Sequence, residues 1–109
     1  MQTHMTEVIA VRAFWWEDQP ERPLSVSIGK PAQTSESSGE FYCPIHTEGF
    51  GNDERTEAIF GVDAFHAIEL AMRYVGYRVS DIDEKSGGKL RWKYSDNQRI
   101  PPEWALRPE

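Results

Sequence analysis

One long helix is the feature that most constrains what this chain can fold into. Between Val62 and Ser80, apolar residues recur at three- and four-residue steps, as on the buried face of an α-helix. This stripe, which we expect to face the core, consists of Phe65, Ile68, Met72, Val75 and Val79, with Ala64 and Ala71 beside it. Asp63 precedes the stripe, where its carboxylate can cap the first turn and face the positive end of the helix dipole.

The same helix carries a second apolar face. At about 100° per residue, it falls opposite the first stripe. Its members are Ala67, Leu70, Tyr74 and Tyr77. The polar sector left between the two faces is narrow and consists of His66, Glu69, Arg73 and Ser80. A helix with free solvent behind it would be more polar, so the pattern predicts that both faces are covered.

Two coverings of the second face are open. The C-terminal tail could fold back and lay Trp104 and Leu106 over it, or two copies of the helix could meet antiparallel in a homodimer. The tail is preferred, because Trp104 otherwise lacks a partner. Either way, the predicted interaction residues are Leu70, Tyr74, Tyr77 and Trp104.

Strand patterns flank the helix. Alternating or β-branched and aromatic residues predict strands at 6–17, 24–28, 40–47 and 55–60, and a fifth at 90–94. Residues 18–23 indicate a turn, and the polar residues 29–39 a long loop. Pro44 cannot donate a hydrogen bond, so its strand is expected at a sheet edge or bulged there.

These elements predict an α+β fold in the order ββββαβ. We expect a mainly antiparallel sheet of four to five strands with one long helix packed on one face. The length of 109 residues suits a single domain over 1–109, in which 1–5 is a flexible lead-in and 98–109 an extended tail rich in proline.

The net charge of −6 lies entirely in the first half of the chain. Residues 1–54 carry nine acidic and three basic residues, whereas the rest of the chain is balanced. This distribution argues against a nucleic-acid partner, which would require a basic face. It could instead attract a basic protein surface, although a solvated acidic face is more common.

Three further features indicate a cytoplasmic protein. Cys43 is the single cysteine, so no intramolecular disulfide can form. No apolar run is long enough to span a membrane. The first residues lack the basic and apolar regions of a signal peptide.

One set of residues could bind a metal ion. Cys43 and His46 have a C-x-x-H spacing, and His66 and Glu69 lie one turn apart on the helix. The opposing argument is stronger, because side chains at an odd separation on a strand point to opposite faces. Cys43 then lies on the core side as a small apolar residue. A nucleophile pair of Cys43 with His46 or His66 has equally little support. We therefore predict no catalytic residue, no metal and no cofactor.

The segment Gly61-Val62-Asp63-Ala64-Phe65-His66-Ala67-Ile68-Glu69-Leu70-Ala71-Met72 resembles the G-V-D-x-x-Q-A-L-x-L-A pattern of a small bacterial family of unknown function. The resemblance extends from about Leu24 to Trp92, and includes Cys43-Pro44, the turn Glu48-Gly49-Phe50-Gly51 and the late Leu90-Arg91-Trp92. The family tends to carry glutamine at the position of His66. It has no established activity, so the resemblance implies a fold and leaves the function open.

Our preferred hypothesis is a non-enzymatic protein-interaction or regulatory domain of the immunity type, which presents an acidic face to a partner. The alternative is a small metal-binding protein or enzyme that uses Cys43, His46, His66 and Glu69.

Overall fold

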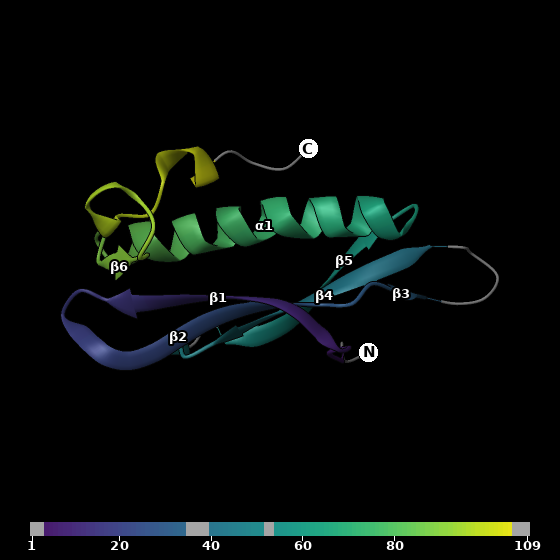
Figure 1. The fold of residues 1–109 in the computed structure, drawn as a ribbon, viewed down its shortest axis with the longest axis horizontal. Coiled ribbons are helices and arrows are strands. Elements are labelled where there is room, and N and C mark those ends of the chain that lie inside the picture. Colours follow the sequence, from purple (N-terminus) through teal and green to yellow (C-terminus); the bar gives the residue numbers. More distant parts are fainter. Residues whose placement is uncertain (1–3, 35–39, 52–53, 106–109) are drawn as a thin grey trace.

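The protein forms two layers, a sheet and one helix that crosses it (Figure 1). The computed structural model describes residues 4–34, 40–51 and 54–105. The strands before the helix are β1 (Val8–Trp16), β2 (Gln19–Gly29), β3 (Ala32–Gln33), β4 (Phe41–Glu48) and β5 (Arg55–Gly61). The helix α1 (Ala64–Lys85) and the strand β6 (Leu90–Arg91) follow.

All strand pairs in the sheet are antiparallel. β4 lies between β5 and β2, β2 is followed by β1, and β1 by β6, while β3 also pairs with β4. The helix packs mainly over β4 and β5, at one side of the sheet. This arrangement confirms the predicted α+β fold.

The junction between β5 and α1 explains the Gly-Val-Asp sequence. The Asp63 carboxylate accepts a hydrogen bond from the backbone N–H of His66 at 2.7 Å, which confirms the predicted N-cap. Gly61 lies against the first turn of the helix, where a Cβ atom would come within 2.4 Å of the backbone nitrogen of Ala67. Only glycine allows the strand and the helix to approach this closely.

The helix is rotated from the predicted orientation. Its buried residues are Ala67, Ala71, Val75, Arg78, Val79 and Ile82. Phe65 and Met72, which we expected in the core, are 88% and 62% exposed. The small side chains of Ala67 and Ala71 bring the helix close to the sheet, and this turns the two larger residues away from the main core.

The helix is also longer than the sequence indicated. It continues to Lys85 instead of ending at Ser80, because Ile82 extends the buried stripe by another turn. The chain then leaves the helix through Gly87, whose φ of +80° suits glycine.

Several predicted strand boundaries are wrong. The first turn contains only Glu17 and Asp18, since Trp16 pairs with Gln19 and the predicted turn residues Pro20 and Pro23 belong to β2. Proline is tolerated there because β4 pairs only with the later part of β2, from Ser25 to Ile28. The predicted loop at 29–39 contains β3, and the fifth strand is limited to β6.

Pro44 does not lie in an edge strand. It belongs to β4, which has neighbours on both sides. Along one edge of β4, Phe41 and Tyr42 pair with β3, and the residues from Ile45 to Glu48 pair with β2. Pro44 therefore falls in the gap between the two partners, where the ladder is interrupted in any case.

The tail after β6 folds back instead of staying extended. It contains two short 3₁₀ helices, η2 (Asp96–Gln98) and η3 (Pro102–Ala105). η3 packs on α1. A Cβ atom added to Gly76 would lie 3.5 Å from the side chain of Trp104. Leu106, which was also expected to cover the helix, lies outside the described residues.

The rotation of the helix can be tested by stability measurements. We expect Ile82→Ala to lower the free energy of unfolding by about 2–4 kcal/mol, since it opens a cavity in the core. Met72→Ala removes an exposed side chain and is expected to cost less than about 1 kcal/mol. Urea denaturation of both variants measures the difference, and a larger loss for Met72→Ala would contradict the observed orientation.

Candidate functional site

The four residues of the hypothetical metal site do not come together. Cys43 is fully buried, and its thiol donates to the carbonyl oxygen of Gly29 at 3.3 Å. His46 Nδ1 lies 2.8 Å from the hydroxyl of Thr56, its partner across β4 and β5. Because Cys43 is in the core and the ring of His46 is not, the odd spacing on the strand separates them, as the sequence suggested.

The helix residues of that set have local partners. His66 Nδ1 accepts the backbone N–H of Val62 at 3.1 Å, and Glu69 pairs with Arg73 at 3.5 Å. Across residues 4–34, 40–51 and 54–105, no three or more His, Cys, Asp or Glu side chains are grouped so that they could bind a metal ion. The geometry therefore does not support the alternative metal or enzyme hypothesis.

A buried polar cluster joins α1 to β5. The Arg78 guanidinium is almost fully buried and lies 3.4 Å from the Glu57 carboxylate. The same carboxylate pairs with Arg55 at 3.2 Å and accepts the Tyr74 hydroxyl at 2.8 Å. Burial is the main cause that raises the pKa of Tyr74, and the hydrogen bond to Glu57 adds to it. These contacts hold the helix on the edge strand, which is a structural role.

The predicted second face of the helix is divided between this cluster and the core. Ala67 is fully buried, and Leu70, Tyr74 and Tyr77 are half-buried. Trp104 packs beside Gly76 and against the rings of Trp92 and Phe14, with centroids at 4.8 and 6.4 Å. Up to Ala105, where the described residues end, the tail therefore contacts the helix at Gly76, and the covering of Leu70, Tyr74 and Tyr77 stays a prediction.

A hollow of about 320 Å³ lies where the β1–β2 turn, the β4–β5 turn and the end of α1 meet. Trp16 and Phe50 form its aromatic part, with ring centroids 6.2 Å apart. Asp18, Arg22 and Lys89 provide charged groups around it. The mixture could hold a small polar molecule with a flat portion.

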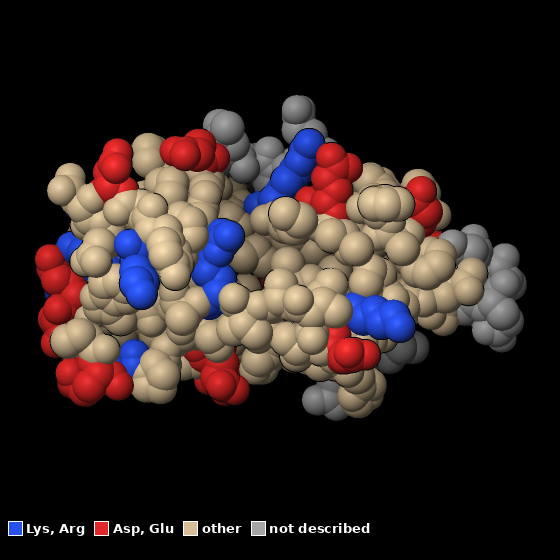
Figure 2. All heavy atoms as spheres, in the orientation of Figure 1, with Lys and Arg blue, Asp and Glu red and all other residues tan. Residues whose placement is uncertain are grey.

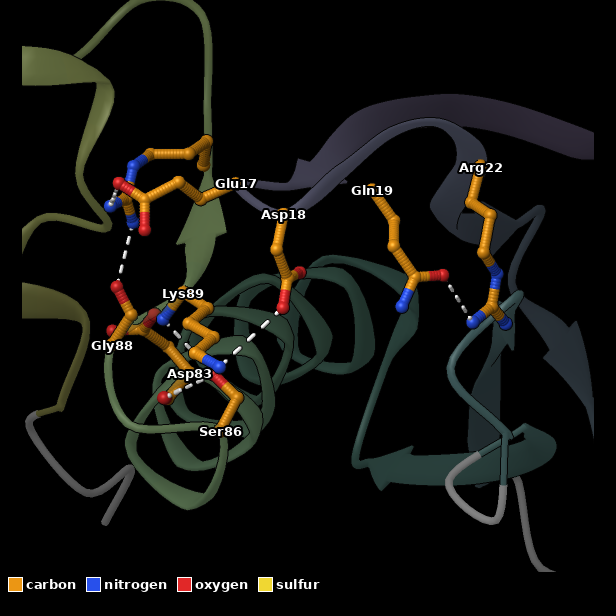
Figure 3. A network of polar contacts seen from close by, with 9 residues as sticks. Glu17, Asp18, Gln19, Arg22, Asp83, Ser86, Gly88 and Lys89 are labelled. Atoms are coloured by element: carbon orange, nitrogen blue, oxygen red, sulfur yellow. Dashed lines mark hydrogen bonds and ion pairs between the residues drawn. The ribbon is translucent and has the colours of Figure 1, made fainter.

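The polar groups around the hollow mainly bind one another. Asp18 and Lys89 point toward each other at 3.4 Å, and Arg22 donates to Gln19 at 3.2 Å (Figure 3). Nearby, Arg91 forms an ion pair with Glu17 at 2.7 Å. These contacts join the first turn to the loop after α1. The hollow is thus better explained as the border of this network than as a ligand site.

The first half of β1 is exposed and apolar. Val8, Ile9 and Val11 are 48%, 50% and 63% exposed. β2 pairs with one edge of β1 along its length, whereas β6 pairs with the other edge only at Trp15 and Trp16. Among the described residues, nothing else pairs with that outer edge. An uncovered apolar edge of this kind is a template for another strand.

A separate line of exposed apolar residues lies on α1. Phe14 of β1 belongs to the core beneath the helix, so Val11, at an odd separation from it, lies on the opposite face of the sheet. Phe65, Met72 and Gly76 lie within about 40° of one another around the helix. Gly76 contacts Trp104, and Trp104 in turn stacks with Arg12 of β1, whose guanidinium carbon is 5.0 Å from the ring centroid. η3 thus covers the C-terminal part of this line, while Phe65 and Met72 remain exposed.

We call the exposed side chains of Val8, Ile9 and Val11, together with the outer edge of β1, the β1 surface. In Figure 2 the right half of this face is mostly tan, with charged side chains of both signs at its upper and lower margins. Red carboxylates gather instead at the left end, over the β1–β2 turn and the end of α1. The β1 surface is the candidate functional site.

Sequence reasoning did not find the β1 surface. The apolar residues of β1 resemble those of a buried strand, but Val11 lies on the face of the sheet that points away from α1 and stays exposed. The spacing of Ala67, Ala71, Val75, Arg78 and Ile82 could have revealed the rotation of the helix. This spacing is hard to recognise in the sequence, because an arginine such as Arg78 is ordinarily expected at the surface.

No helix in the described part of the chain is long and apolar enough to cross a membrane. A family model described as a domain of unknown function (DUF6968) matches residues 10–102. The chain therefore belongs to this family, as its resemblance to a family of unknown function suggested. None of the curated proteins or solved structures compared with it matches the chain.

The state of Cys43 can be tested by alkylation. Burial raises the pKa of its thiol, so the reactive thiolate is disfavoured at neutral pH. We expect iodoacetamide to leave the native protein unmodified and to label it fully after unfolding in guanidinium chloride, as measured by intact mass. Rapid stoichiometric labelling of the native protein would show that Cys43 is an accessible nucleophile.

The buried cluster predicts a pH dependence that involves Tyr74. Because its pKa is raised in the folded state, its stabilising contribution is complete below the ordinary value near 10 and is lost as the pH rises through the folded value. The stability advantage of wild type over Tyr74→Phe should therefore shrink as the pH rises from about 9.5 to about 11 in urea denaturation. An advantage that stays constant or grows over this range would contradict the assignment.

Proposed function

We propose that this domain is a non-enzymatic protein-interaction module whose partner docks along the β1 surface. The observation that carries the proposal is the uncovered outer edge of β1 with its exposed Val8, Ile9 and Val11. Exposed edges of this type are usually shortened, charged or covered, because they otherwise pair with other chains. Here the exposed half of the strand has one charged side chain, that of Arg12.

The recognition mode that fits this edge is strand addition. An extended segment of the partner would form backbone hydrogen bonds with β1, and its side chains would contact the apolar residues beside the edge. Such a site needs no catalytic group, which agrees with the buried position of Cys43.

A regulatory role of the immunity type is the form of this proposal that the net charge of −6 favours. The partner would then be basic around the apolar contact. Glu17 and Asp18 are already paired with Arg91 and Lys89, so they would contribute less to such a contact than an unpaired carboxylate. The apolar edge therefore carries more of the proposal than the acidic face does.

Affinity capture with a matched pair of variants tests the proposal. We expect immobilised wild-type protein to retain at least one protein from a lysate of its source organism at moderate salt. Val11→Lys adds a charge at the uncovered edge and should lose that protein. Phe60→Lys, at a comparably exposed apolar residue on β5, should retain it. Equal retention by Val11→Lys, or no retained protein at all, would count against docking at β1.

A further inference from the structure

We infer that the segment which docks on the β1 surface carries a carboxylate that binds Arg12, next to an apolar residue that contacts Val11. The inference rests on the proposed function and names the chemistry of the partner segment. It concerns one position of that segment, within the apolar contact, whereas the basic surface proposed above would surround this contact.

The guanidinium group of Arg12 lies toward the outer side of β1. Arg12 and Phe14 are two residues apart, and Phe14 belongs to the core beneath the helix, so both side chains lie on the face that carries α1. The guanidinium carbon of Arg12 is 4.6 Å from the ring centroid of Trp92 and 5.0 Å from that of Trp104. Trp92 directly follows β6, the outer neighbour of β1. The side chain therefore leans toward the position that an added strand would take.

The stacking on the two rings holds the guanidinium group and leaves its hydrogen-bond donors available. A guanidinium group contacts aromatic rings with its flat face, whereas its N–H groups bind a carboxylate at the edge of the same plane. Arg12 is exposed, and it forms no ion pair with a carboxylate of the described residues. A side chain that is already held loses less conformational entropy on binding. Arg12 is therefore prepared to bind a carboxylate from outside the protomer.

The alternation of β1 is regular from Arg12 to Glu17, despite the register shift with β2 near Trp16. The rings of Phe14 and Trp16 both lie against the ring of Phe50, with centroids at 6.4 and 6.2 Å. These two side chains therefore point to the same face, and the additional residues at the shift belong to β2. The directions of backbone groups and side chains in this part of β1 can thus be assigned by counting residues.

Val11 and Ala13 present their backbone groups at the outer edge. The N–H of Glu17 donates to the carbonyl oxygen of Lys89 at 2.8 Å, so the backbone of Glu17 points toward that edge. Alternate residues point the same way, and these include Val11 and Ala13. An added antiparallel strand would bond to these two residues, and Arg12 between them would face its opposite residue in a pair without backbone hydrogen bonds. Side chains come closest in such pairs.

This pairing specifies a pattern in the partner segment. Opposite charges across a strand pair stabilise it, so the residue opposite Arg12 is expected to be Asp or Glu. The next residue of the antiparallel segment lies opposite Val11, with its side chain on the face of the sheet away from α1. Val11 is 63% exposed, so an apolar residue there buries apolar surface of both chains. The expected pattern is an acidic residue followed by an apolar one.

Selection from a phage-displayed library of random peptides tests the inference. With immobilised wild type, we expect the enriched peptides to share an acidic residue followed by an apolar one. With Arg12→Glu, the enriched peptides should carry Lys or Arg at the acidic position, because the charge opposite it has changed sign. Arg22→Glu, at an exposed cation outside the β1 surface, should keep the wild-type preference. An unchanged preference for an acidic residue on Arg12→Glu would overturn the inference.

The affinity of one enriched peptide gives a second readout, which needs no reversal of charge in the protein. The acidic residue of the peptide is changed to the corresponding amide, and both peptides are titrated onto wild type and Arg12→Gln by fluorescence anisotropy. We expect wild type to bind the acidic peptide about tenfold more tightly than the amide peptide, and Arg12→Gln to bind the two about equally. Equal binding of the two peptides to wild type would contradict the inference.

A neighbouring cation provides the matched control. Lys93 is exposed, and its ammonium nitrogen lies 5.6 Å from the ring centroid of Tyr94. Lys93→Gln should keep the wild-type preference for the acidic peptide. A preference that is lost in Lys93→Gln and kept in Arg12→Gln would assign the carboxylate to Lys93 and overturn the inference. Circular dichroism shows whether each variant is folded, and Arg12→Gln remains informative if Arg12→Glu does not fold.

The outcomes separate the two proposals. If Val11→Lys loses the enriched peptides but these contain no acidic residue, docking at β1 stands and the inference about Arg12 fails. If Val11→Lys retains the peptides, or if no peptide is enriched on wild type, the inference fails and the lysate capture described above decides the proposed function.

Discussion

The close approach of α1 to β4 and β5 is the constraint on which the rest of the structure depends. Ala67 and Ala71 are fully buried, and Gly61 places backbone against the first turn of the helix. These small residues allow the helix to lie near the sheet without a layer of large side chains between them. The contact fixes the rotation of the helix, and the Arg78–Glu57 pair holds it on the edge strand.

This constraint also determines what stays uncovered. A single helix drawn toward β5 cannot cover the other side of a sheet that extends from β5 to β6. The tail covers part of the remaining area, where Trp104 contacts Phe14 and stacks with Arg12. The first half of β1 stays exposed, because Val11 lies on the face of the sheet that points away from α1. The proposed interaction surface thus lies on that face and at the outer edge of the strand.

Much of the fold could be predicted from local patterns. The N-cap at Asp63, the existence of the helix and four main strands of the sheet followed from periodicity and capping chemistry. The rotation of the helix could not, because periodicity reports two apolar stripes without saying which one meets the sheet. Residue size decided between them, and Ala67 was buried in preference to Phe65 and Met72.

The candidate site could be predicted even less well. A strand that is apolar on both faces has the same pattern whether it lies inside a sheet or at its edge. The edge position of β1 depends on pairings with β2 and β6 that are distant in sequence. The sequence directed attention instead to Cys43 and His46, whose odd spacing on β4 separates them across the sheet.

Urea denaturation of Gly61→Ala tests the central claim most directly. A Cβ atom at this position would lie 2.4 Å from the backbone nitrogen of Ala67, so the account predicts a clear loss of stability relative to wild type. A Gly61→Ala variant as stable as wild type would contradict the close approach of α1 to the sheet.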